Sequence, residues 1–187
     1  MQAYFFVGPK EIVARVEKKY EGHKINHIED IQKWITASNQ TIINEQLIAT
    51  FIINEQAELV LSDRHSEHVI CAGGRNVLSA GEITFNFEQE AIIVSAISNQ
   101  STGYCPKPAS WEVVEIALNK LKINHPTYFT SAFEFRYCEH CQNKNLIKEA
   151  IYECAVCGSD LAVEWNIYKM KNNIKSNGTR KNKVLFR

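Results

Sequence analysis

The hydrophobic residues of this chain follow two spacings, one typical of helices and one typical of strands. Apolar residues three or four positions apart predict helices over 12–20, 28–35 and 110–121, the last with Ser110 as its N-cap. Short runs rich in β-branched and aromatic residues predict strands over 3–7, 47–53, 59–62, 69–71, 82–87, 91–97 and 129–137. Short polar connections join the five strands between residues 46 and 97, and this arrangement is typical of an antiparallel meander.

Two Cys-x-x-Cys pairs follow the last predicted strand, Cys138 with Cys141 and Cys154 with Cys157, and residues 142–153 separate them. A turn of this kind aims two thiolates and nearby backbone amides at one point, so two turns supply four tetrahedral sulfur ligands. Zinc is the favoured ion because four thiolates suit a redox-inactive metal, and iron in a rubredoxin-like site is the second choice. Two disulfides or a redox dithiol pair are the remaining alternatives. A closed four-sulfur site has no open coordination position, so we expect a structural role.

Residues 137–165 resemble the zinc ribbons of many nucleic-acid-binding and protein-binding proteins, and this resemblance implies a folded appendage. Gly158 supplies the left-handed residue often needed after the second Cys-x-x-Cys turn, whereas Gln142 and Asn143 stand where a glycine often follows the first. His140 lies inside the first turn, and we expect it to point outward.

The fold class that follows is α+β, with an antiparallel β-sheet meander, flanking helices and a C-terminal zinc ribbon. We expect an N-terminal strand and helices over 1–45 that pack on the main domain, a β-rich core over 46–136, the ribbon over 137–168 and a basic tail over 169–187.

Charge is uneven along the chain. The 21 basic and 21 acidic residues cancel, but the tail holds seven of the basic residues and none of the acidic ones, which leaves an acidic body. A basic tail can bind phosphates, so nucleic acid is a second predicted partner beside a protein. The chain has no run of 18 apolar residues and no basic leader, so we expect a cytoplasmic protein without membrane contact.

The polar loop 98–108 lies between a predicted strand and a predicted helix, where functional sites tend to occur. The candidate catalytic residues are in this loop and in an earlier histidine-rich turn, namely Cys105, Asn99, His65, His68 and Tyr104. The candidate binding residues are Ser66, Ser101 and Arg75. Turns, bulges and backbone hydrogen bonds are the structural alternatives for the polar residues and glycines of these segments.

Three enzyme classes share part of this pattern. His65 and Glu67 form a His-x-Glu element similar to that of zinc-dependent nucleobase deaminases, but their downstream Pro-Cys-x-x-Cys element is missing. A cysteine protease arrangement would pair Cys105 with a histidine, although Pro106 leaves no backbone amide beside that cysteine. The order of elements is similar to that of ubiquitin-conjugating enzymes, and this resemblance implies a thioester on Cys105 and an oxyanion contact from Asn99. The His-Pro-Asn signature of that family is absent.

A more local resemblance covers about residues 50–125. The motifs that carry it are His65-Ser66, Gly73-Gly74, Ala80-Gly81-Glu82, Ser98, Ser101 and Tyr104-Cys105-Pro106. They are similar to an uncharacterised β-rich domain of some bacterial toxin-type proteins and of plant IQ-motif proteins. Thr102-Gly103 departs from its usual ending and no IQ-type helix is present, so the resemblance implies a fold and a toxin association but no calmodulin binding.

These observations lead to two hypotheses of different classes. The first is a cytoplasmic zinc-binding adaptor or binding protein that acts through the β-rich domain and a structural zinc ribbon. The alternative is a cysteine-dependent acyl or ubiquitin-like transfer enzyme with Cys105 as its nucleophile.

Overall fold

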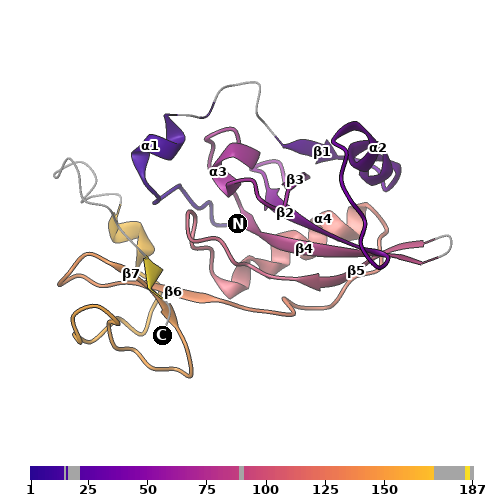
Figure 1. The fold of residues 1–187 in the computed structure, drawn as a ribbon. Coiled ribbons are helices and arrows are strands. Elements are labelled where there is room, and N and C mark those ends of the chain that lie inside the picture. Colours follow the sequence, from indigo (N-terminus) through magenta and orange to yellow (C-terminus); the bar gives the residue numbers. More distant parts are fainter. Residues whose placement is uncertain (15, 17–21, 89–90, 171–183, 186–187) are drawn as a thin grey trace.

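The computed structural model describes residues 1–14, 16, 22–88, 91–170 and 184–185, and it contains two sheets (Figure 1). The larger sheet has the strand order β1-β3-β2-β4-β5, and every pairing in it is antiparallel. Its strands are β1 (His23–Ile25), β2 (Gln46–Ile53), β3 (Leu59–Asp63), β4 (Ser79–Glu88) and β5 (Ala91–Ile97). The smaller sheet contains β6 (Glu134–Tyr137), β7 (Lys144–Ile147) and β8 (Val184–Leu185).

In the described residues, four α-helices and two 3₁₀ turns accompany the sheets. The helices are α1 (Lys10–Val13), α2 (Glu29–Ala37), α3 (His68–Cys71) and α4 (Trp111–Lys120), and the 3₁₀ turns are η1 (Pro108–Ser110) and η2 (Ile167–Lys169). The predicted α+β class and the antiparallel sheet are therefore confirmed.

Several predicted elements differ from the structure. The segment 69–71, predicted as a strand, lies in helix α3, and this helix carries the chain from β3 across β2 to β4. Strand β1 was not predicted. The segment 3–7 forms a single bridge, from Tyr4 to Val77, and no strand. Of the helix predicted over 12–20, α1 covers only the start, and residues 15 and 17–20 lie outside the described residues.

The N-cap prediction for Ser110 is also wrong. This residue lies directly before α4, but its side chain makes no capping hydrogen bond. Its hydroxyl instead lies 3.0 Å from the hydroxyl of Ser79 at the start of β4, and both side chains are buried. The bond joins the loop before α4 to the central sheet, and so fixes where that loop ends.

The large sheet is covered on both faces because its strands alternate their buried side chains. On one face, Phe51 and Phe85 pack with the apolar sides of α2 and α4. On the other face, Ile52 and Val60 pack with α3, Tyr4 and Tyr104. The N-terminal segment and the loop 98–108 therefore lie on the face opposite the two longer helices.

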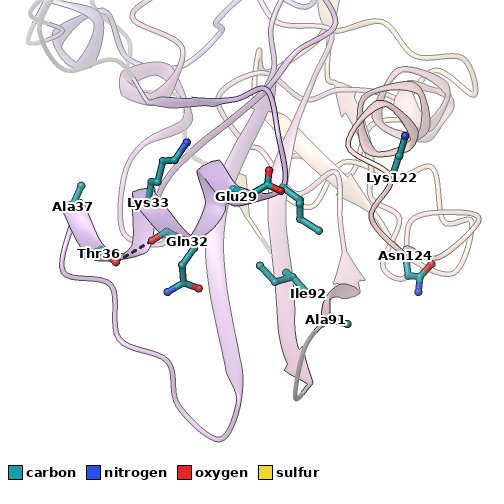
Figure 2. A pocket seen from close by; sticks show the side chains of 10 residues that line it. Glu29, Gln32, Lys33, Thr36, Ala37, Ala91, Ile92, Lys122 and Asn124 are labelled. Atoms are coloured by element: carbon teal, nitrogen blue, oxygen red, sulfur yellow. Dashed lines mark hydrogen bonds between the residues drawn. The ribbon is translucent and has the colours of Figure 1, made fainter.

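A groove of about 910 Å³ lies on the helical face, between α2, the start of β5 and the residues that follow α4 (Figure 2). Ile28 and Ile92 are among its apolar lining residues, and Lys122 and Asn124 stand at the side opposite α2. Among the described residues, no helix combines the length and the apolar character needed to cross a membrane.

Gly81 in β4 is a site where any side chain would disturb the sheet. A Cβ atom built on it would lie 1.9 Å from the carbonyl oxygen of Ser98. We expect Gly81→Ala to lower the free energy of unfolding by about 3 kcal/mol, because β4 and the segment at Ser98 cannot separate without weakening the bond from the Ser98 amide to the Glu82 carbonyl. Urea denaturation measures this difference.

Gly74→Ala is the matched control. Among the described residues, a Cβ at Gly74 meets Val16 alone, at 3.8 Å, but Gly74 has a left-handed φ of 77°. Its substitution should cost about 1 kcal/mol from backbone strain alone. Equal losses for the two variants would contradict the steric role of Gly81.

Candidate metal centre

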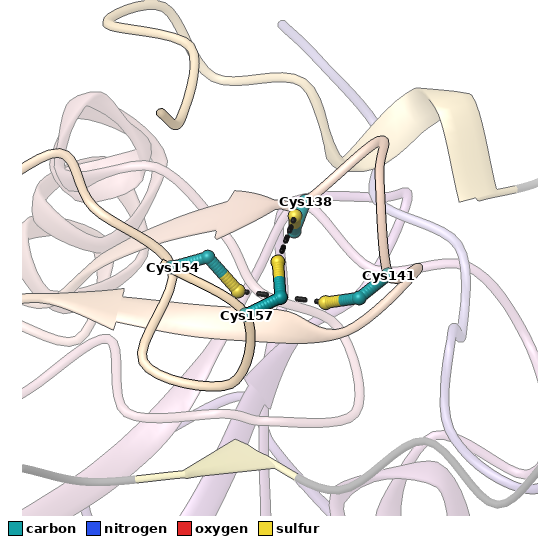
Figure 3. A group of neighbouring side chains, drawn as sticks. All are labelled: Cys138, Cys141, Cys154 and Cys157. Carbon is teal, nitrogen blue, oxygen red and sulfur yellow. Dashed lines mark hydrogen bonds between the residues drawn. The ribbon is translucent and has the colours of Figure 1, made fainter. Parts of the chain in front are cut away.

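The four cysteines of the two Cys-x-x-Cys turns meet at one point (Figure 3). Their sulfur atoms all lie within 4.8 Å of one another. The Cys138 and Cys157 sulfurs are 3.7 Å apart, and those of Cys141 and Cys154 are 3.5 Å apart. All four are free thiols, so the two disulfides of the alternative prediction are not formed in this structure.

These separations fit a tetrahedral ion. A Zn–S bond of about 2.3 Å gives a tetrahedron with S–S edges of about 3.8 Å, close to the two measured distances. Thiolates are soft ligands that suit zinc, and four of them complete its coordination sphere. The cluster can therefore hold a metal ion of this type and leaves no position for a substrate.

The two turns have the same backbone hydrogen bonds. In the first, the Cys138 amide donates to the carbonyl of Asn143, and the Gln142 amide donates to the carbonyl of Cys138. In the second, the Cys154 amide donates to Ser159 and the Gly158 amide donates to Cys154. The repetition shows that two equivalent turns present the ligands.

The equivalent turns have different residues at the left-handed position. Gly158 has a φ of 71°, as expected for the residue after the second turn, and Gln142 has a φ of 62° at the equivalent place. The sequence predicted a departure near Gln142 and Asn143, and the structure assigns the left-handed conformation to Gln142. This conformation is strained for a residue that has a Cβ.

Polar side chains around the cluster orient the sulfurs. Asn143 and Asn145 donate from their amide nitrogens to the sulfurs of Cys141 and Cys154, at 3.4 and 3.5 Å. Hydrogen bonds from the side chain and backbone of Ser159 lower the pKa of Cys157 to about 5, and His140 contributes a weaker one. Such contacts favour the thiolate form that a metal requires.

The composition of residues 146–147 and 151–153 favours a hairpin between the two Cys-x-x-Cys turns, but the strands of the structure pair differently. Leu146 and Ile147 lie in β7, which pairs antiparallel with β6 and parallel with β8. Glu153 forms an isolated bridge with Asp160 instead. Residues 171–183 and 186–187 of the predicted basic tail lie outside the described residues, and within that tail β8 joins the ribbon's sheet.

The ribbon is fastened to the main domain by buried polar contacts. The ammonium of Lys144 is buried and donates to the carbonyl of Thr102 at 2.5 Å and to that of Val7 at 3.5 Å. The indole nitrogen of Trp165 donates to the carbonyl of Cys105 at 2.9 Å. Apolar side chains fill the same interface, namely Val7, Cys105, Phe135, Tyr137, Ile167 and Met170.

Cys105 lies inside this interface. Its side chain is fully buried, and its thiol donates to the carbonyl of Thr102 at 3.4 Å. Burial raises the pKa of Cys105 to about 11, although the nearby charge of Lys144 acts in the opposite direction. The thiolate that a nucleophilic cysteine needs is therefore disfavoured.

Asn99, like Cys105, has a structural role. Its amide nitrogen donates to the carbonyls of Pro106 and Phe133, at 2.9 and 2.8 Å, and its amide oxygen accepts from the amide of Phe133. These bonds close the loop 98–108 onto the segment that leads into β6. They use both donors of the side chain, so none is left for an oxyanion.

The other candidates in the loop support its packing. The hydroxyl of Tyr104 donates to the carbonyl of Arg75 at 2.6 Å, and its ring lies edge-on to Phe6. Burial raises the pKa of this phenol well above its usual value. Ser101 is buried, and its hydroxyl accepts from the amide of Tyr104. Arg75 itself is exposed.

The histidine-rich turn lies after β3, apart from Cys105. His65 is exposed, and its backbone amide is bonded to the carboxylate of Asp63. The ring of His68 lies 3.0 Å from the carbonyl of Gly81, and burial lowers its pKa to about 4. The carbonyl of Ser66 accepts from the hydroxyl of Thr50. No hydrogen bond among the described residues joins either histidine to Cys105.

Sequence reasoning missed the residues that support the metal cluster and the interface. Lys144, Asn145, Trp165 and Asn166 all hold buried or bridging contacts there. Lys144 and Asn145 follow the first Cys-x-x-Cys turn within four residues, and this proximity is the only signal of their role that the sequence carries.

Comparison of the chain with protein-family models, with curated proteins and with solved structures found no match.

The strain at Gln142 gives a paired prediction. We expect Gln142→Gly to raise the free energy of unfolding by about 1 kcal/mol, because glycine adopts the left-handed conformation without steric cost. Gly158→Gln should lower it by about the same amount, since the nearest described atom to a Cβ there is in the Glu153 carboxylate, at 4.0 Å. Denaturation of the zinc-loaded proteins measures both, and shifts of the same sign would contradict the equivalence of the two turns.

The burial of Cys105 predicts its chemical protection. In the zinc-loaded protein, brief treatment with iodoacetamide at pH 8 should leave Cys105 unmodified, because the thiol is inaccessible and its pKa is raised. Peptide mapping by mass spectrometry measures this, and the same protein in denaturant is the control. Fast, selective modification of Cys105 in the folded protein would instead support the transfer-enzyme hypothesis.

Proposed function

We propose that this protein is a zinc-binding adaptor whose ribbon contacts a partner protein. Three features support the proposal. The four-thiolate cluster has the composition of a structural zinc site. The polar residues of the loop 98–108 are engaged in packing, as the bonds of Asn99 and Tyr104 illustrate. The ribbon is held against the main domain by Lys144 and Trp165, so it presents a defined surface.

The observation that carries the proposal is the exposure of large apolar side chains on the ribbon. Ile151 is 58% exposed, Val156 44% and Val163 65%. Val156 lies between Cys154 and Cys157, so its position depends directly on the metal cluster. Apolar side chains held on a rigid frame are typical of protein contact surfaces, whose centres exclude water.

The role of zinc follows from the same arrangement. Metal binding contributes folding free energy to small domains whose ligands come from separate turns. The cluster joins the turn 138–141 to the turn 154–157, and the strands around the first turn carry Lys144 and the interface residues Phe135 and Tyr137. Loss of the metal would therefore remove both the ribbon's surface and its attachment.

The experiment compares zinc content and partner binding in matched variants. Cys154→Ser should reduce bound zinc from one ion per chain to none, as native mass spectrometry measures, and should lower the melting temperature. The double variant Val156→Asp and Val163→Asp should keep zinc and stability, because both side chains are exposed. Ile43→Asp is the control, since Ile43 is 66% exposed but lies on the main domain.

Partners are first identified by capture from cell extract with the zinc-loaded protein, and each is then purified for affinity measurement. We expect the double variant to raise the Kd at least tenfold, equivalent to about 1.4 kcal/mol, and Ile43→Asp to leave it unchanged. Failure to capture any protein in a zinc-dependent way would overturn the proposal, as would equal affinities for all zinc-loaded variants.

A further inference from the structure

The groove beside α2 has the size and lining of a ligand site. Its volume of about 910 Å³ is within the range of about 300–1,000 Å³ that is usual for small-molecule sites. Four apolar residues from two elements line it, namely Ile28, Ala37, Ala91 and Ile92. A surface of this kind favours a ligand with an aliphatic chain.

The charged groups around the groove are distributed unevenly. On the α2 side, Lys33 is paired with Asp30 at 2.9 Å, and hydrogen bonds from Lys33 and from backbone amides lower the pKa of Asp30 to about 2. Glu29 stands on the same side. On the opposite side, Lys122 and Asn124 come from the segment after α4 (Figure 2).

Lys122 is the lysine of this groove that can form an ion pair with a ligand. It forms no ion pair with any residue that the structure describes, and its side chain is exposed. It also has a φ of 53° at the residue after the C-cap of α4, a place where glycine is preferred. A lysine at that position costs stability relative to glycine.

We propose that this groove binds an aliphatic monocarboxylate of the fatty-acid class. The carboxylate accepts a hydrogen bond from the Lys122 ammonium, and the chain lies over Ile28 and Ile92. A charge-assisted bond to an ammonium is stronger than a bond between neutral groups. Glu29 repels a carboxylate at the α2 side, so the charge distribution also sets the direction in which the ligand lies.

The test titrates the full-length, zinc-loaded protein with sodium octanoate, decanoate and dodecanoate below their micelle concentrations. Calorimetry gives the affinity, and amide chemical shifts locate the site. We expect saturable binding at one site per chain, with the affinity rising about fourfold for each methylene that the groove buries. Decylamine, which has a chain of the same length and the opposite charge, should bind at least tenfold more weakly than decanoate.

Variants on the two sides of the groove distinguish the effect of charge on binding from the effect of groove shape. Lys122→Glu should weaken decanoate binding at least tenfold, while Lys120→Glu, which changes the same charge two residues away from the groove lining, should leave it unchanged. Glu29→Gln should strengthen binding about twofold to threefold. Lys122→Gly should weaken binding and at the same time raise the melting temperature, because glycine relieves the left-handed conformation.

Three results would overturn the proposal. These are the absence of saturable binding to all three carboxylates, equal affinity for decylamine and decanoate, and unchanged affinity in Lys122→Glu. The groove lies on the main domain and the proposed adaptor surface lies on the ribbon, so the outcome is independent of the partner-binding experiment.

Discussion

The buried ammonium of Lys144 is the contact on which the arrangement of the molecule depends. It joins the strand β7 of the ribbon to the carbonyls of Thr102 and Val7, which belong to the long loop and to the N-terminal segment. Burial lowers the pKa of this lysine because a charge is costly in an apolar environment. The carbonyl oxygens offset that cost only when all three segments are in place, so the contact favours one relative position of ribbon and sheet.

The polar composition of the loop 98–108 follows from the place of this loop in the fold. It lies between the large sheet and the ribbon, where part of it is buried, and buried amides and carbonyls need partners. Asn99 and Ser101 provide such partners within the loop, and Trp165 provides one from the ribbon. A polar loop between two regular elements can therefore lie at the interface of two packed units, where its side chains form hydrogen bonds with the backbone.

The sequence allowed the metal cluster and the sheet to be predicted for different physical reasons. The Cys-x-x-Cys spacing determines local geometry, and so Cys138 to Cys157 could be assigned without knowledge of the fold. The strands β2, β4 and β5 are long enough for their composition to indicate their type. The segment 69–71 is too short for its composition to distinguish a strand from a helix. It lies in α3, and Val69 and Cys71 pack there against one face of the large sheet. Long-range contacts such as Lys144 to Val7 leave no local pattern, so the roles of Asn99, Cys105 and Lys144 could not be assigned in advance.

The contact between Lys144 and Val7 spans 137 positions of the chain, and this separation sets an order for biosynthesis. The large sheet can close once residue 97 has left the ribosome, since all its strands precede that point. The segment around Val7 has its remaining neighbours in Phe135, Tyr137 and Ile167, which are translated much later. The nascent chain therefore exposes these apolar side chains to water until Ile167 has emerged, ten residues after the second Cys-x-x-Cys turn.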